Sequence, residues 1–100
     1  MNRTHKYFTY IITTRNIKLL YVGVTSNLKQ RLIEHVTGKR GGYTQRYQCH
    51  YLLYFEEFKY IDKAIKREKE LKGWSKKKKF ALIQTKNPQL KFLNDEILSQ

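Results

Sequence analysis

Three segments of the chain carry the pattern of hydrophobic and polar positions that is typical of strands. The segments 7–12, 18–24 and 51–58 are rich in aromatic and β-branched residues, which favour pleated, half-buried backbone. The polar stretch TTRNI between the first two is short enough for a hairpin. We therefore predict a three-stranded mixed central sheet that begins with an N-terminal antiparallel hairpin.

Helical spacing of apolar residues predicts the elements around this sheet. In 25–38, Leu28, Leu32 and Val36 fall on one face, and Gly38 is placed to end the helix. The glycine pair and the polarity of 39–50 predict a loop.

The carboxyl half predicts further helices. One covers roughly 60–72 and stops at Gly73, and another is capped by Ser75 and runs to about Thr85. Segment 91–98 is a helix candidate by propensity alone. Strands and helices in this order predict an α/β (α+β) fold in which helices flank the sheet.

Composition narrows the classes of protein that fit. The 100 residues contain no repeat and no linker, so we interpret 1–100 as a single domain. Lys and Arg number 21 against 8 acidic residues, and the net charge of +13 is spread along the chain. This favours a nucleic-acid partner, although a membrane surface or a solubilising charge would give the same composition. The single cysteine, Cys49, cannot form an internal disulfide, and no run of residues resembles a signal peptide or is long enough to span a membrane. We therefore predict a cytoplasmic, nucleoid-associated protein without a membrane part.

One carboxylate falls among the apolar residues of the helix 60–72. At about 100° per residue, Glu68 lies between Ala64 and Ile65 and near Ile61. The other charged side chains of this segment are predicted to point away, namely Lys63, Lys66, Arg67 and Glu70. A carboxylate facing inward requires a cation. A metal ion would supply it, and so would a partly exposed structural ion pair.

Two other groups of residues suggest chemistry. Arg31 and His35 are spaced i, i+4 beside an apolar arc, where arginine would bind a phosphate and histidine would move a proton. A solvated helix edge is the alternative. Strand alternation brings Tyr10 and Tyr21 onto inner faces of the hairpin, and Gly23 indicates close approach of another backbone or a ligand. Simple core packing of the tyrosines is the alternative there.

These residues occur in an order that resembles one enzyme superfamily. The tripeptide FTY, then YVG after a short hairpin, then Arg31, His35 and Glu68 resemble the GIY-YIG nucleases over roughly residues 6–90. The segments REKELKGW and NP are similar to those of small single-domain bacterial members. The resemblance implies a three-stranded sheet flanked by helices and a metal-dependent hydrolase that cuts a nucleic-acid phosphodiester.

The resemblance also implies roles. Tyr10 and Tyr21 match the tyrosines of the two tripeptides, Arg31 the catalytic arginine, and His35 a position held by tyrosine or histidine. Glu68 matches the metal-binding glutamate, which implies Mg²⁺ or Mn²⁺ as cofactor. A tyrosine or His35 would accept the proton of the attacking water. Chemistry favours the histidine and the resemblance favours a tyrosine.

The chain departs from the family pattern at two places. FTY lacks the glycine that opens the first tripeptide, and Val24 follows YVG where some relatives carry a lysine. Asn87 is a candidate for the asparagine that family members carry late in the domain.

Basic residues predict where nucleic acid would bind. Lysines at the start of a helix oppose its dipole, and an anion there would compensate. The predicted nucleic-acid-binding residues are Lys39, Arg40, Arg46, Lys76, Lys77, Lys78 and Lys79. Tyr43 and Tyr47 are available to stack on unpaired bases. A solvated charge run is the alternative.

We therefore predict a divalent-metal-dependent DNA endonuclease, structure-selective or weakly sequence-specific, that acts in DNA repair or recombination. RNA stays open as a substrate, and a protein partner would supply targeting. The alternative is a nucleic-acid-binding module whose nuclease activity has decayed or depends on a partner. A basic RNA- or ribosome-associated protein would leave the spacing of the matched residues to coincidence.

Overall fold

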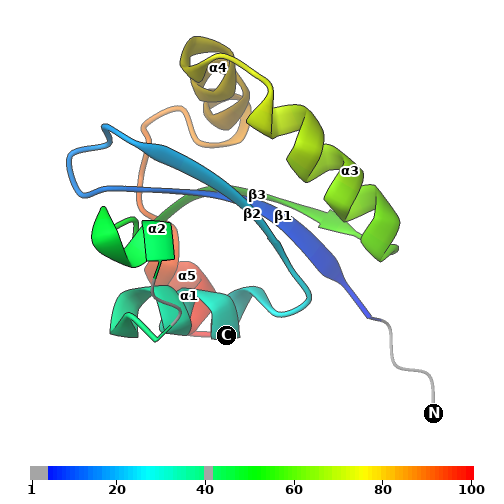
Figure 1. Ribbon diagram of the computed structural model, residues 1–100, viewed down its shortest axis with the longest axis horizontal. Coiled ribbons are helices and arrows are strands. Elements are labelled where there is room, and N and C mark those ends of the chain that lie inside the picture. The colour runs from blue at the N-terminus through cyan, green and yellow to red at the C-terminus, as the bar shows by residue number, and fades with distance from the viewer. Residues whose placement is uncertain (1–4, 40–41) are drawn as a thin grey trace.

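The computed structural model describes residues 5–39 and 42–100. Arg40, predicted to bind nucleic acid, lies outside these residues. The described elements follow one another in the order β1 (Tyr7–Thr13), β2 (Leu20–Thr25), α1 (Leu28–Thr37), α2 (Gly42–Arg46), β3 (Tyr51–Phe58), α3 (Ile61–Lys72), α4 (Lys76–Lys86) and α5 (Asn94–Leu98) (Figure 1).

The strands form one sheet in the order β2-β1-β3 within the described part of the chain. β1 pairs antiparallel with both neighbours, so the predicted mixed sheet is wrong in this detail. The reason is that β3 runs in the same direction as β2 on the far side of β1. In this register Tyr10 faces Gly23 on one side and Phe55 on the other, which places these three residues in one row across the sheet.

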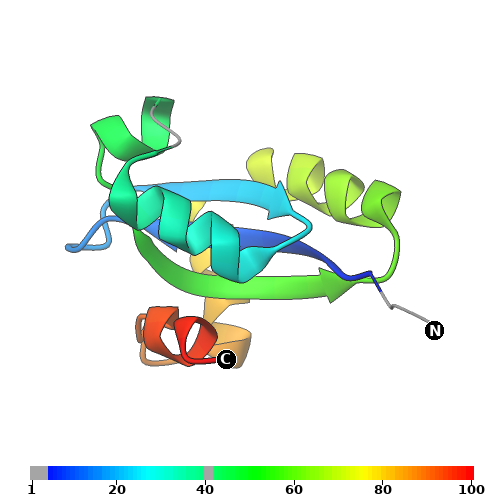
Figure 2. The same cartoon turned by 90° about the horizontal axis from the view of Figure 1, so that it is seen from below.

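Helices cover both faces of the sheet, which confirms the α+β class. α1 and α5 lie on one face, and α3 and α4 lie on the other (Figures 1 and 2). Alternate residues of β1 divide between the two hydrophobic clusters, because successive side chains of a strand point to opposite faces. The buried side chains on the α1 face include Tyr10, Ile12, Leu32, Leu52 and Ile97, and those on the α3 face include Ile11, Leu53, Leu71 and Ile83.

Helix α1 begins and ends as its sequence predicts, but the inward residue of its last turn differs from the expected one. The side chain of Asn27 accepts a hydrogen bond from the backbone of Gln30, and Gly38 ends the helix at φ 74°. Val36, predicted to face the core, is 52% exposed, whereas His35 is buried. The final turn faces polar groups of β1 and α2 that bind an imidazole, so the histidine takes the inward position.

The segment 39–50, predicted as a loop, contains the short helix α2. The backbone N–H of Cys49 donates to the carbonyl of Thr44 at 2.8 Å, which closes the helix against a buried cysteine. Five residues without a periodic apolar pattern do not predict a helix from sequence. Its contacts with the rest of the domain therefore account for its form.

Helix α3 is fastened to β3 by an ion pair that the sequence pattern did not predict. Arg67, expected to point away, donates to both carboxylate oxygens of Glu56, at 2.9 and 3.0 Å. The hydroxyl of Tyr54 donates to the same carboxylate, and the guanidinium also lies over the ring of Trp74. Burial raises the pKa of the Glu56 carboxyl, but the hydrogen bonds from Arg67 and Tyr54 outweigh it and hold that pKa below its usual value.

Glu56→Gln is expected to lower stability in a pH-dependent way. Loss of the charged hydrogen bonds lowers the free energy of unfolding by about 1.5 kcal/mol near neutral pH, or the melting temperature by about 6–12 °C. Because the folded-state pKa is depressed, this contribution is present above the ordinary carboxyl pKa of 4.5 and disappears as pH falls through the lower folded value. Melting curves of both proteins from about pH 7 to pH 3 should therefore converge in acid. Glu57→Gln, at an exposed ion pair with Lys6, is the control and should match the native protein at every pH.

Candidate active site

The centre of the candidate site is a buried row of hydrogen bonds across three elements. The hydroxyl of Tyr10 in β1 lies 3.1 Å from Nε2 of His35 in α1. Nδ1 of the same imidazole lies 3.0 Å from the hydroxyl of Thr44 in α2. All three residues are buried. Both ring nitrogens of His35 therefore have protein partners, and its orientation is defined.

Gly23 leaves the space that the Tyr10 ring occupies. A Cβ atom at position 23 would lie 2.5 Å from both Cζ and the hydroxyl oxygen of Tyr10. The prediction of a close approach at Gly23 is therefore right, but the approaching group is a side chain of the neighbouring strand and not a backbone or a ligand. The glycine of the second tripeptide thus sets the position of the first tyrosine.

Tyr21 lies at the outer side of this row. Its ring meets the His35 ring edge-on, with centroids 6.4 Å apart, and stacks on Tyr43 of α2 at 5.9 Å. Tyr43 in turn contacts Tyr47 at 4.6 Å. Tyr21 is half-buried, whereas Tyr43 and Tyr47 are exposed. The two predicted tyrosines, Tyr10 and Tyr21, do stand together, and they meet at the imidazole.

Arg31 lies one helical turn before His35 and reaches towards the edge strand. Its Nη1 donates to the backbone carbonyl of Val24 in β2 at 3.4 Å, and its Nε lies 3.3 Å from the Glu34 carboxylate. The arginine side chain is 23% exposed. A guanidinium with a long hydrogen bond and a partly exposed ion pair is able to exchange partners for a phosphate.

Glu68 lies on the other face of the sheet, in α3. Its side chain is 17% exposed and pairs with Lys72 at 3.4 Å, which is the structural ion pair that the sequence left as an alternative. At about 100° per residue, Arg67 and Glu68 lie on opposite sides of the line through the buried Ala64 and Leu71. Because Arg67 binds β3, we infer from the helical geometry that Glu68 points away from β3, towards the β2 side of the sheet. Ile61, expected beside it on the inward face, is exposed.

The structure thus joins three of the five predicted residues directly. Tyr10, Tyr21 and His35 form one cluster, Arg31 flanks it on α1, and Glu68 leans towards the same edge strand from the opposite layer.

Among the described residues, no three His, Cys, Asp or Glu side chains gather as metal ligands. A single carboxylate suits Mg²⁺, which keeps most of its waters and takes phosphate oxygens of a substrate. Glu68 fits this, since Lys72 is half exposed and free to turn away.

Comparison with known proteins shows the family. The GIY-YIG catalytic domain matches residues 6–81 of the chain. The chain belongs to the GIY-YIG family. Relatives of this GIY-YIG domain include a UPF0213 protein of Staphylococcus saprophyticus, 35% identical over 78 residues, which are 78% of this chain and 94% of the relative. A UPF0213 protein of Syntrophus aciditrophicus is 35% identical over 85 residues, or 84% of this chain and 95% of that one.

A solved structure supports the same assignment. The solution NMR structure of a UPF0213 protein from Bacillus halodurans is 26% identical to this GIY-YIG domain, with a TM-score of 0.55. The likeness covers 84% of this chain and 88% of the other. The resemblance drawn from the two tripeptides and the fold class that it implied are thereby confirmed.

The late asparagine of this GIY-YIG domain has a structural place. Asn87 caps the end of α4 and is buried. Its amide donates to the carbonyls of Leu53 and Lys91 and accepts from the backbone of Lys91. These bonds hold the turn after α4 against β3.

The predicted nucleic-acid-binding residues divide between two places in the GIY-YIG domain. Lys39 follows α1, and Arg46 ends α2, where it lies over the Tyr47 ring at 5.7 Å. The lysines of the second group, Lys76, Lys77, Lys78 and Lys79, open α4, and the Ser75 side chain caps that helix as predicted. Lys76 donates to the carbonyl of Lys18, and Lys78 lies 4.1 Å from the centre of the Trp74 ring. Contacts within the domain therefore account for part of this charge.

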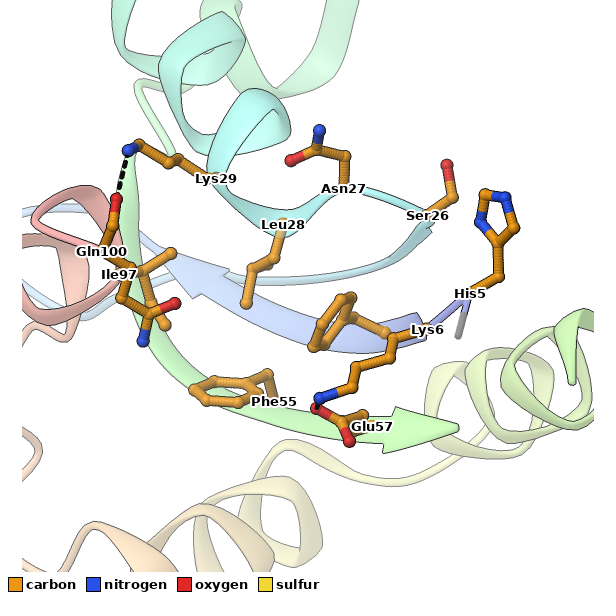
Figure 3. A pocket seen from close by; sticks show the side chains of 11 residues that line it. His5, Lys6, Ser26, Asn27, Leu28, Lys29, Phe55, Glu57, Ile97 and Gln100 are labelled. Atoms are coloured by element: carbon orange, nitrogen blue, oxygen red, sulfur yellow. Dashed lines mark hydrogen bonds and ion pairs between the residues drawn. The ribbon is translucent and has the colours of Figure 1, made fainter. Parts of the chain in front are cut away.

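Two pockets among the described residues lie beside the candidate site. A pocket of about 420 Å³ opens between the start of α1, β3 and α5, with Phe8, Leu28 and Phe55 at its apolar wall (Figure 3). A shallower groove of about 730 Å³ runs between the β1–β2 turn and the start of β3 and includes Tyr47. None of the five predicted catalytic residues lines either one.

None of the helices in the described part of the chain has the length and apolar content to cross a membrane.

Sequence reasoning missed Thr44 and the Glu56–Arg67 pair. Thr44 carried no signal, because it lies in a polar segment that lacks a recognisable period. Arg67 and Glu56 are separated by eleven positions, and only the packing of α3 on β3 brings them together.

Proposed function

We propose that this GIY-YIG domain is a divalent-metal-dependent DNA endonuclease. The observation that carries the proposal is the contact of Tyr10 and Tyr21 with His35, one helical turn from Arg31, in a chain whose family is a nuclease family. The four side chains come from β1, β2 and α1. They match the family pattern in type as well as in order.

Burial separates the roles within this cluster. Tyr10 and His35 are almost fully buried and bonded to each other, so neither faces water directly. Tyr21 is the half-buried member and has access to an attacking water. We therefore assign Tyr21 as the group that accepts the proton, with the Tyr10–His35 pair behind it as a defined polar support.

Charge on the phosphate would be balanced from two sides of β2. Arg31 would leave Glu34 and donate to the non-bridging oxygens of the phosphoryl group, on which charge grows in the transition state. Glu68 would hold the divalent metal after Lys72 turns away. When bound, the metal supplies Lewis-acid stabilisation of the departing oxygen.

We propose the substrate class from the distribution of basic residues in the domain. The basic residues after α1 and at the start of α4 favour binding to the phosphate backbone. Because the sequence offers no pattern typical of a recognition helix for base edges, we propose structure-selective or weakly sequence-specific cleavage, with a role in DNA repair or recombination. The Glu68–Lys72 ion pair is the observation that favours the alternative, a binding module that needs a partner for activity.

The proposal is tested by cleavage of end-labelled single-stranded, duplex and branched DNA, and of RNA of the same sequence. We expect the native protein to cut at least one DNA substrate when Mg²⁺ or Mn²⁺ is present, and we expect EDTA to stop this cleavage. Arg31→Ala should cut about 10²- to 10³-fold more slowly, because its guanidinium acts on transition-state charge.

Lys91→Ala, which removes one positive charge at an exposed position after α4, is the charge-matched control and should cut like the native protein. Equal rates for the native protein and Arg31→Ala would assign the activity to a contaminant. Binding of every substrate without any cleavage would establish the binding-module alternative.

A further inference from the structure

Thr44 lies outside the family pattern and makes a side-chain hydrogen bond to the candidate site. It lies in α2, is 6% exposed, and its hydroxyl contacts Nδ1 of His35 at 3.0 Å. The opposite ring nitrogen faces the Tyr10 hydroxyl at 3.1 Å. The imidazole is therefore held at both nitrogens, by groups that come from different elements.

This arrangement determines the orientation of the ring. A neutral imidazole has one donor and one acceptor nitrogen, and a hydroxyl is able to match either one. A partner at Nδ1 decides in which direction Nε2 points, as it does when histidine serves in catalysis or metal binding. Removal of the Thr44 hydroxyl would take this hydrogen bond from Nδ1 and loosen the orientation of the ring.

We propose that Thr44 is a positioning residue that holds the His35 imidazole with Nε2 towards Tyr10. The adjacent Tyr43 stacks on Tyr21, with ring planes 24° apart. Consecutive residues of α2 thus contact both the imidazole and the tyrosine that we assign as proton acceptor. The proposal rests on the function proposed above, since it names the residue that sets the geometry of that site.

A merely structural threonine would behave differently from a positioning one. α2 is also held by the bond from Cys49 N–H to the Thr44 carbonyl, which is a backbone contact and survives any substitution of the side chain. Thr44→Val keeps the β-branched shape and removes only the hydroxyl. Thr44→Ser keeps the hydroxyl and removes only the methyl group.

The experiment measures the ¹⁵N shifts of the His35 ring by NMR, together with cleavage rates. The shifts of Nδ1 and Nε2 report which nitrogen carries the proton, and a His35→Gln variant assigns the signals among the three histidines of the chain. Thr44→Val should change this pair of shifts and slow cleavage by about tenfold or more. Thr44→Ser should restore the shifts and cut within about threefold of the native rate.

Thr85→Val is the matched control, since the Thr85 hydroxyl is exposed on α4 and bonds only to its own helix in the described structure. It should leave both readouts unchanged. Unaltered His35 shifts in Thr44→Val would overturn the proposal, and so would altered shifts with native cleavage. Absence of metal-dependent cleavage in the native protein would instead overturn the proposed function itself, and the two failures are distinct.

Discussion

Glu68→Gln is expected to abolish metal-dependent cleavage while nucleic-acid binding persists. The substitution keeps the size of the side chain and removes the α3 carboxylate that we propose as the metal ligand. Loss of the metal from the site should lower the rate by about 10³-fold or more, equivalent to about 4 kcal/mol of transition-state stabilisation. The measurement is single-turnover cleavage across a Mn²⁺ series, with binding followed separately by fluorescence anisotropy in EDTA.

Glu70→Gln is the control for this change. It lies two residues further along the same helix, is exposed, and pairs with Arg67 at the surface. Because an exposed ion pair contributes little, its loss should leave cleavage and melting temperature nearly unchanged. Native cleavage by Glu68→Gln would contradict the metal role and leave Glu68 as the partner of Lys72 only.

Gly23→Ala is expected to have the largest effect on stability. A Cβ atom would overlap the rigid ring of Tyr10, which is 1% exposed and has no room to retreat. Overpacking of this kind should lower the free energy of unfolding by about 3 kcal/mol, which lowers the melting temperature by about 12–24 °C. The ring would also move from His35, so cleavage should fall even at temperatures where the variant is folded. Thermal melts and cleavage at low temperature check both parts.

Gly73→Ala provides the comparison for that variant. Gly73 has right-handed helical backbone, and a Cβ atom there would meet its nearest neighbour at an ordinary 3.5 Å. Alanine should therefore be tolerated at position 73. If Gly23→Ala and Gly73→Ala have the same melting temperature, the contact between Gly23 and Tyr10 does not determine the packing of the hairpin.

Most of the fold was predictable because it follows local patterns. Alternation defined the three strands, and caps such as Ser75 and Gly38 defined helix ends to within a residue or two. The direction of β3 relative to β1 was not predictable, because it depends on how the chain crosses between strands. The burial of His35 in place of Val36 likewise depends on partners from β1 and α2 that are distant in sequence.

The candidate site was predictable in its residues but not in its connections. The spacing of Tyr10, Tyr21, Arg31, His35 and Glu68 was sufficient to suggest the family, which the match over residues 6–81 confirms. Their catalytic roles stay predictions. The hydrogen bond from the tyrosine to the imidazole is a tertiary contact, and no local pattern in the chain encodes it.

The division of the proposed catalytic groups between the two sides of the sheet has a kinetic consequence. The groups that handle the proton and the phosphate pack in the α1 layer, and the carboxylate proposed for the metal packs in the α3 layer. The two layers pack on opposite faces of the sheet, and the Glu56–Arg67 pair fastens the second layer to it. Loosening of that pair should therefore disturb the carboxylate proposed for the metal more than the Tyr10–His35 contact on the other face. Such a protein would keep the hydrogen bonds of the imidazole and lose turnover.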